Sequence, residues 1–175
     1  MTSASSFHIT PLAPSIHDRA GFDCGVEALN RYLQQHAMQD MRRRDAACWV
    51  IVGLDEPSKI LGFYTLSNDS VMAEILPALT SAQRKKLGPY PNLGAYLLGR
   101  LAVAKSQQGQ GLGTRLLLDA ITRCANAEIP APLMVLDAKD ADAELFYRRF
   151  GFEKLLNGRL YAPLYALQER LRSLD

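Results

Sequence analysis

The sequence has no continuous apolar run of the length, about eighteen residues or more, that a membrane-spanning helix needs. Its first residues lack the basic start and apolar block of a secretory signal peptide. Cysteine is scarce: Cys24, Cys48 and Cys124 are an odd number with no metal-type spacing, which favours free, buried thiols. These absences predict a cytoplasmic protein with no membrane partner and no bound metal.

A large excess of charge of one sign is also missing. Lysine and arginine total 20 against 18 aspartate and glutamate, giving a net charge of +2. A nucleic-acid partner must therefore be argued from local clusters and not from the total charge. The chain also lacks repeats, low-complexity tracts and linkers, and its 175 residues suffice for a substantial core. We expect a single domain over residues 1–175.

What the sequence does contain is a glycine-rich turn between an apolar strand and an amphipathic helix. The strand is predicted over residues 94–104, the turn over 108–113 and the helix over 111–127. In such a turn the unpaired N–H groups of the first helical turn and the positive end of the helix dipole converge. The pattern predicts a site for a phosphate or pyrophosphate.

Three kinds of glycine loop could supply this site. A Walker loop needs a terminal Gly-Lys-Ser/Thr, which is absent. A dinucleotide fingerprint fits Gly109 and Gly111, but its third glycine position holds Thr114, and no acidic residue ends a second strand about twenty residues on. The pattern Gln/Arg-x-x-Gly-x-Gly/Ala is matched in full by Gln108, Gly111 and Gly113. A strand-to-helix turn without a ligand remains the alternative.

The third pattern resembles the loop of the GNAT (Gcn-five-related N-acetyltransferase) superfamily, which holds the pyrophosphate of acetyl-CoA. The resemblance implies an α/β (α+β) fold with a mixed, mainly antiparallel central sheet, helices on both faces and a splayed acetyl-CoA-binding cleft. It also implies that a backbone N–H of Leu101 or Val103 polarises the thioester carbonyl. The acetyl-CoA contacts that it implies are Leu101, Ala102, Val103, Gln108, Gly109, Gln110, Gly111, Leu112, Gly113 and Thr114.

A second segment follows the glycine loop by about forty residues: Phe146 and Tyr147, then Gly151 and Phe152. A helix ended by glycine and followed by an apolar strand is ordinary in α/β proteins. Together with the loop, however, the segment resembles one of GNAT enzymes, and this implies that Tyr147 protonates the thiolate of coenzyme A as it leaves. The alternative is that Tyr147 packs in the core with its hydroxyl bonded.

Three further segments resemble one GNAT subgroup: Phe22-Asp23-Cys24-Gly25, residues 62–66 and residues 98–103. This subgroup is the toxin acetyltransferases of bacterial toxin–antitoxin pairs, which acetylate the α-amino group of aminoacyl-tRNA and stop translation. The resemblance implies a ribbon-helix-helix antitoxin as partner and leaves homodimer formation open. An α-amino group has a pKa of about 7.7 to 8, so such an enzyme needs no strong general base. The sequence shows no obvious one.

Two basic clusters are candidates for contacts with the phosphates of tRNA. They are Arg42, Arg43 and Arg44, and then Arg84, Lys85 and Lys86. For each residue the alternative is an ordinary solvated helix face. Two other functions stay open: a GNAT acetyltransferase acting on a protein N-terminus, a lysine or a small-molecule amine, and a non-enzymatic acetyl-CoA-binding module. The basic clusters favour an anionic substrate over a polyamine.

The other predicted elements follow from hydrophobic period and turn signals. A long helix is expected from residue 26 toward residue 44, capped by Asp23, and a short one over 80–87, capped by Thr80. Asn157-Gly158 predicts a tight hairpin. The remaining strands are expected over 7–12, 47–52, 60–66, 133–137, 152–155 and 159–161, and the remaining helices over 140–150 and 164–171.

Overall fold

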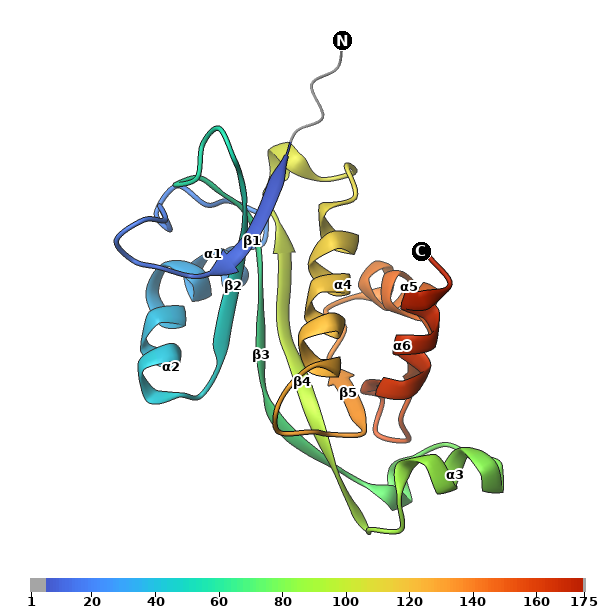
Figure 1. The fold of residues 1–175 in the computed structure, drawn as a ribbon. Coiled ribbons are helices and arrows are strands. Elements are labelled where there is room, and N and C mark those ends of the chain that lie inside the picture. Colours follow the sequence, from blue (N-terminus) through green and yellow to red (C-terminus); the bar gives the residue numbers. More distant parts are fainter. Residues whose placement is uncertain (1–5, 175) are drawn as a thin grey trace. The chain divides into compact units, whose positions relative to one another are not determined.

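A computed structural model describes residues 6–174, and the fold divides into two compact units. The first runs up to Ser67 and includes Gly99–Ala120; the second comprises Asn68–Leu98 and the chain from Ile121 onward. Seven strands form one sheet in the order β1-β2-β3-β4-β5-β7-β6 (Figure 1). Strands β4 and β5 pair in parallel, whereas the pairs β1–β2, β2–β3, β5–β7 and β6–β7 are antiparallel. The expected mixed, mainly antiparallel sheet is confirmed.

The first unit contains three neighbouring antiparallel strands. Strand β1 (Phe7–Pro11) pairs with β2 (Ala47–Gly53), which pairs with the start of β3 (Ile60–Met72). Figure 1 shows β1 lying along β2. The helical connection consists of α1 (Glu27–Arg31), a π-helical segment (Tyr32–His36) and α2 (Ala37–Arg43). The hairpin predicted from the two apolar runs is confirmed, but β3 continues through a polar stretch that the sequence did not mark as a strand.

Helices cover both faces of the sheet in this unit. On one face Leu33 packs in a core cluster with Val50 and Phe63. On the other face Gly62 lies under α4 (Leu112–Ala125), where an added Cβ would come within 3.0 Å of the Leu116 Cδ1 atom. The absence of a side chain at Gly62 therefore lets α4 approach the sheet closely.

The predicted capping role of Asp23 is wrong. The N-cap of α1 is Val26, which makes no side-chain cap, and Asp23 lies farther upstream. Its Oδ1 atom instead accepts hydrogen bonds from the Gly25 N–H at 2.8 Å and the Asn30 side-chain amide at 2.9 Å. Because Gly25 is left-handed at φ +86°, the chain turns between Asp23 and the helix, so the carboxylate holds that turn.

The second unit contains α3 (Ser81–Leu87), whose predicted cap is confirmed, since Thr80 and Gln83 form a capping box. Helix α5 (Ala141–Arg149) is capped by Asp140. The core of this unit gathers apolar side chains of β4 (Asn92–Val103), β5 and β7, including Leu93, Leu133 and Tyr161. The other elements are β5 (Leu133–Leu136), β6 (Glu153–Lys154), β7 (Leu160–Pro163) and α6 (Leu164–Arg172).

Two expectations drawn from what the sequence lacks can be compared with the structure. All three cysteines are free and buried, as expected. No helix within residues 6–174 is long and apolar enough to cross a membrane.

The end of β4 is tied to the N-terminal loop of the first unit. The Gln108 side-chain amide donates to the backbone carbonyls of Cys24 and Val103, both at 3.0 Å. The Lys105 N–H donates to the Asp23 carbonyl at 2.9 Å. The glycine turn therefore starts from a strand end that residues 23–25 hold in place.

Replacing Gln108 by alanine should lower the free energy of unfolding by about 1–2 kcal/mol, because two backbone carbonyls lose their side-chain donor. Urea denaturation followed by tryptophan fluorescence measures the change. Gln110→Ala is the matched control, since the Gln110 side chain is exposed in the same turn. Equal destabilisation by both substitutions would contradict the bracing role of Gln108.

Candidate active site

The glycine turn leads directly into α4. Gly109 and Gly111 are left-handed at φ +78° and +81°, a region that favours glycine. A Cβ at either position would meet no atom within 4 Å, so this side of the turn is open. Leu112 is buried and anchors the start of the helix, while Gly113 and Thr114 are half-buried in its first turn. The free N–H groups of that turn and the helix dipole make an open anion site that suits a pyrophosphate.

The strand that precedes the turn is only partly covered. Ala102 is buried, whereas Leu101 and Val103 are half-buried. The parallel pairing of β4 with β5 joins Ala95–Leu97 to Leu133–Val135, and β4 continues from there to Val103. The Val103 carbonyl accepts a hydrogen bond from the Gln108 side chain. The predicted polarisation of the thioester carbonyl therefore depends on the N–H groups of this strand end.

Tyr147 lies on α5 in the second unit and is 8% exposed. Its ring makes edge-on contacts with Phe146 and Phe152, at centroid distances of 5.1 and 5.8 Å. Burial raises the pKa of the phenol above its ordinary value, which keeps the hydroxyl protonated near neutral pH. No residue within 6–174 makes a hydrogen bond with this hydroxyl. The role of Tyr147 as a proton donor stays a prediction, as does the alternative that it only packs in the core.

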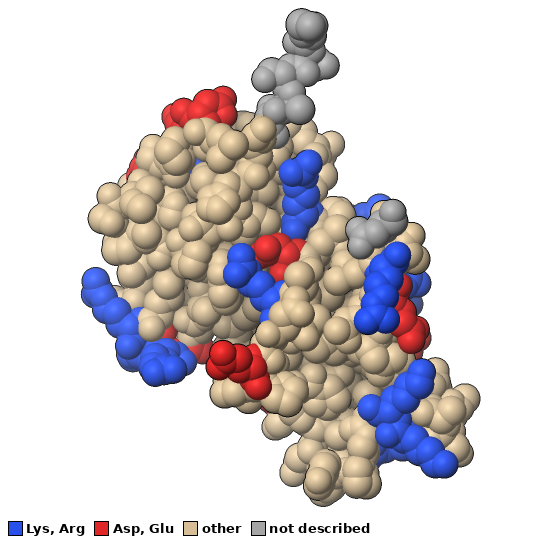
Figure 2. Space-filling view, in the orientation of Figure 1, with Lys and Arg blue, Asp and Glu red and all other residues tan. Residues whose placement is uncertain are grey.

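The first basic cluster lies at the C-terminal end of α2, where Figure 2 shows Lys and Arg side chains gathered. Arg43 forms ion pairs with Asp40 at 2.9 Å and Asp45 at 2.8 Å. Arg42 and Arg44 are exposed. These two residues therefore offer a polyanion more accessible charge than Arg43 does.

The second basic cluster lies on α3, and its three members differ in what they contact. The Arg84 guanidinium donates to the carbonyls of Gly88 and Tyr90 and closes the end of the helix. The Lys86 ammonium lies 4.6 Å from the centroid of the Tyr165 ring. Lys85 is exposed. Arg84 thus has a structural role that its position in a basic run did not reveal.

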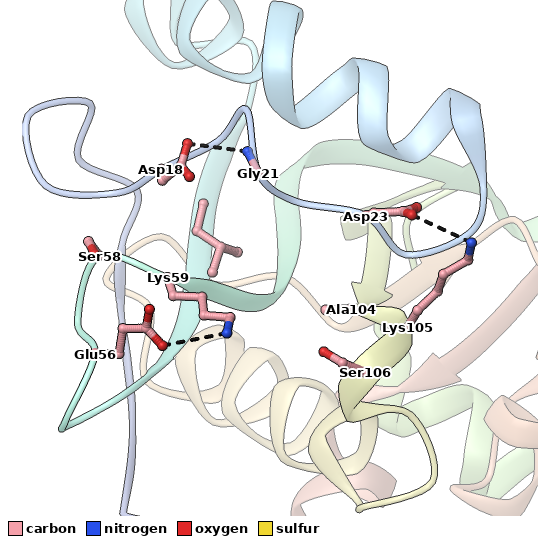
Figure 3. Close-up of a pocket in the computed structure, with 10 residues that line it drawn as sticks. Asp18, Gly21, Asp23, Glu56, Ser58, Lys59, Ala104, Lys105 and Ser106 are labelled. Atoms are coloured by element: carbon pink, nitrogen blue, oxygen red, sulfur yellow. Dashed lines mark hydrogen bonds and ion pairs between the residues drawn. The ribbon is translucent and has the colours of Figure 1, made fainter.

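A pocket of about 400 Å³ lies beside the end of β4 in the first unit (Figure 3). Most of its charges are paired within its own wall: Lys105 with Asp23 and Lys59 with Glu56, each at 3.5 Å. Asp18 accepts a hydrogen bond from the Gly21 N–H at 3.2 Å. Carboxylates outnumber ammonium groups here, so this pocket suits a pyrophosphate less well than the glycine turn does.

Sequence reasoning did not predict the bracing role of the Gln108 side chain. Its partner Cys24 is 84 residues away, and no local spacing marks that pairing. No group of three or more His, Cys, Asp or Glu side chains within residues 6–174 could hold a metal ion.

Comparisons of the sequence with known proteins give matches to acetyltransferases and to toxins. The family model of the acetyltransferase (GNAT) domain matches residues 44–154. The tRNA-acetylating toxin of Mycobacterium tuberculosis is 33% identical over 138 residues, which cover 78% of each chain. The probable toxin TacT of Sinorhizobium fredii is 26% identical, with 95% of this chain and 96% of that protein covered.

Solved structures agree with these matches. AtaT complexed with acetyl-methionyl-tRNAfMet superposes with a TM-score of 0.83 at 28% identity, covering 95% of this chain and 99% of that one. AtaTR bound with acetyl-CoA gives 0.78 at 29%, covering 94% and 98%. A Tyr-to-Phe variant of AtaT bound to the C-terminus of the antitoxin AtaR gives 0.75 at 26%, covering 94% and 97%. With its glycine turn, its mixed sheet and these matches, the chain belongs to the acetyltransferase (GNAT) family.

Proposed function

We propose that this protein is an acetyl-CoA-dependent N-acetyltransferase that acetylates the α-amino group of aminoacyl-tRNA and so blocks translation. The observation that carries the proposal is the open glycine turn at the start of α4, in a chain similar to a tRNA-acetylating toxin over most of its length. AtaT, with a similar fold, is complexed with acetyl-methionyl-tRNA, the product expected of this reaction.

Acetyl-CoA is held by the backbone of residues 101–103 and 108–114. The N–H groups at the turn and in the first turn of α4 receive the pyrophosphate, and the open sides of Gly109 and Gly111 leave room for it. The end of β4 receives the pantetheine and the thioester carbonyl. The acetyl-CoA complex of the similar AtaTR supports this choice of donor.

The reaction forms a C–N bond and breaks a C–S bond. The free α-amine attacks the thioester carbonyl, whose developing negative charge is stabilised by a backbone N–H of Leu101 or Val103. The nitrogen of the tetrahedral intermediate loses a proton to water, the intermediate expels the thiolate of coenzyme A, and Tyr147 donates its phenolic proton to that sulfur. Water then returns a proton to the Tyr147 phenolate, so the products are the amide and the free thiol. Because an α-amine has a pKa of about 7.7 to 8, a fair fraction is already unprotonated at neutral pH.

The partners follow from the same relationship. AtaT is seen bound to the C-terminus of an antitoxin, and we infer an antitoxin of the ribbon-helix-helix class for this chain too. A toxin that acts on aminoacyl-tRNA works in the cytoplasm. We infer one N-acetyltransferase domain over residues 1–175, with acetyl-CoA as co-substrate and no metal.

Gly111→Glu should weaken acetyl-CoA binding by at least about tenfold, because a carboxylate at the turn repels the pyrophosphate and a side chain at this φ is strained. Isothermal titration calorimetry measures the affinity. Gly158→Glu is the matched control: Gly158 has φ +87° and open space around it, but lies in the β6–β7 hairpin. Equal weakening by both substitutions would refute the assignment of the turn.

Tyr147→Phe should keep the affinity for acetyl-CoA and lower kcat by about 10²–10⁴-fold, the usual contribution of a general acid. Transfer of label from radioactive acetyl-CoA to a pool of charged tRNA measures turnover. Tyr90→Phe, which alters an exposed tyrosine, is the control. Unchanged turnover in Tyr147→Phe would remove Tyr147 from the mechanism, and transfer only to peptides or polyamines would redirect the substrate assignment.

The rate should depend on pH through the substrate. Between pH 6 and about 8, kcat/KM should rise as the α-amine loses its proton. Above pH 8 the rise in kcat/KM should slow as deprotonation of the amine nears completion. It should not fall up to pH 9, because burial raises the pKa of Tyr147 and keeps the donor protonated. Initial rates in a constant-ionic-strength buffer series test this profile. A descending limb between pH 8 and 9 that disappears in Tyr147→Phe would show that the phenol pKa lies below its ordinary value, contrary to this expectation.

A further inference from the structure

Arg100 places a cation on the apolar face of β4 in the first unit. It lies on the same face of β4 as Ala102, two residues on, which is buried in the core cluster that also holds Tyr32 and Leu33. Arg100 itself is partly buried. Its guanidinium carbon lies 3.5 Å from the centroid of the Tyr32 ring. The position of this charge is therefore set by an aromatic surface of the core.

The ring beneath the guanidinium is itself fixed. The Tyr32 hydroxyl donates to the Asp40 Oδ2 atom at 2.9 Å, and its ring stacks on Phe63 at a centroid distance of 6.3 Å. The other oxygen of Asp40 accepts from the Arg43 guanidinium at 2.9 Å. A continuous series of contacts thus links Arg100, through Tyr32 and Asp40, to the basic end of α2.

Arg100 differs from Arg43 and Arg159 in having no carboxylate partner among the described residues. Arg43 and Arg159 each form ion pairs with two aspartates, whereas no carboxylate within residues 6–174 lies within 4.0 Å of the Arg100 side-chain nitrogens. A partly buried charge without a counter-charge is costly. Stacking on Tyr32 occupies only the flat face of the guanidinium. Its N–H donors lie in the guanidinium plane and can still bond to a ligand. Their planar arrangement matches the oxygens of a phosphate.

We propose that Arg100 binds a phosphate near the aminoacylated 3′ end of the acceptor tRNA, an inference that rests on the proposed function. Arg100 directly precedes residues 101–103, the proposed site of the thioester carbonyl. The anion that the substrate carries closest to its reacting amine is the phosphodiester next to the aminoacylated ribose. Arg42 and Arg44, exposed at the end of α2, then serve phosphates farther along the strand, and such a series of cations suits a polyanion.

Two matched acceptors test this assignment: an aminoacylated CCA trinucleotide, which contains phosphodiesters, and an aminoacylated adenosine, which has none. Arg100→Gln should raise KM for the trinucleotide about tenfold, the order expected for one lost charge-assisted contact, and leave KM for the nucleoside unchanged. The affinity for acetyl-CoA should stay the same in both cases. Arg100→Lys, which keeps the charge without the fork, should give an intermediate KM.

Arg31→Gln is the control, because Arg31 is exposed and paired with Glu27 on the surface of α1. Its KM values for both acceptors should equal those of the wild type. Equal KM increases for both acceptors in Arg100→Gln, or none for either, would overturn the phosphate contact while leaving the acetyltransferase assignment intact. The phosphate contact would also be overturned if Arg100→Gln left the KM values for both acceptors unchanged but lowered the affinity for an acidic antitoxin peptide. Failure of the wild-type protein to acetylate either acceptor would instead overturn the proposed function, and this inference with it.

Discussion

The unpaired backbone N–H groups at the start of α4 are the constraint on which the rest of the site depends. A helix cannot satisfy its first N–H groups internally, and in the turn before it a Cβ at Gly109 or Gly111 would meet no atom within 4 Å. Two left-handed glycines shape that turn, and buried Leu112 fixes where the helix begins. A phosphate site made of backbone N–H groups needs a fixed backbone conformation. Contacts within the first unit fix the conformation of this turn.

These contacts come from segments far apart in the sequence. The Gln108 side chain and the Lys105 N–H form hydrogen bonds with the loop at residues 23–25. The absence of a side chain at Gly62 allows α4 to pack closely on the sheet. The N-terminal segment therefore supports the proposed acetyl-CoA site, although none of its side chains is expected to touch acetyl-CoA. In the GNAT motif of this chain, the glutamine acts as a structural brace and the glycines leave the space for the ligand.

Charge in this protein is divided between two uses. Arg43, Arg84 and Arg159 are occupied by carboxylates or carbonyls of their own chain, and they stabilise turns and helix ends. Arg42, Arg44 and Lys85 are exposed, and Arg100 is held by an aromatic ring without a carboxylate. This difference explains how a chain with a net charge of only +2 can present local cationic surface to an anionic substrate.

Local sequence determined the elements and the chemistry of the loop. Hydrophobic period marked the strands and helices, Thr80 marked a cap, and Gln108, Gly111 and Gly113 marked the acetyl-CoA family, because each of these signals lies within a few neighbouring residues. Tertiary structure alone decided that the Gln108 side chain bonds to Cys24, that β3 extends to Met72 and that Arg100 stacks on Tyr32. These features depend on partners brought together by folding, and the energy of such long-range contacts leaves no periodic signal in the chain.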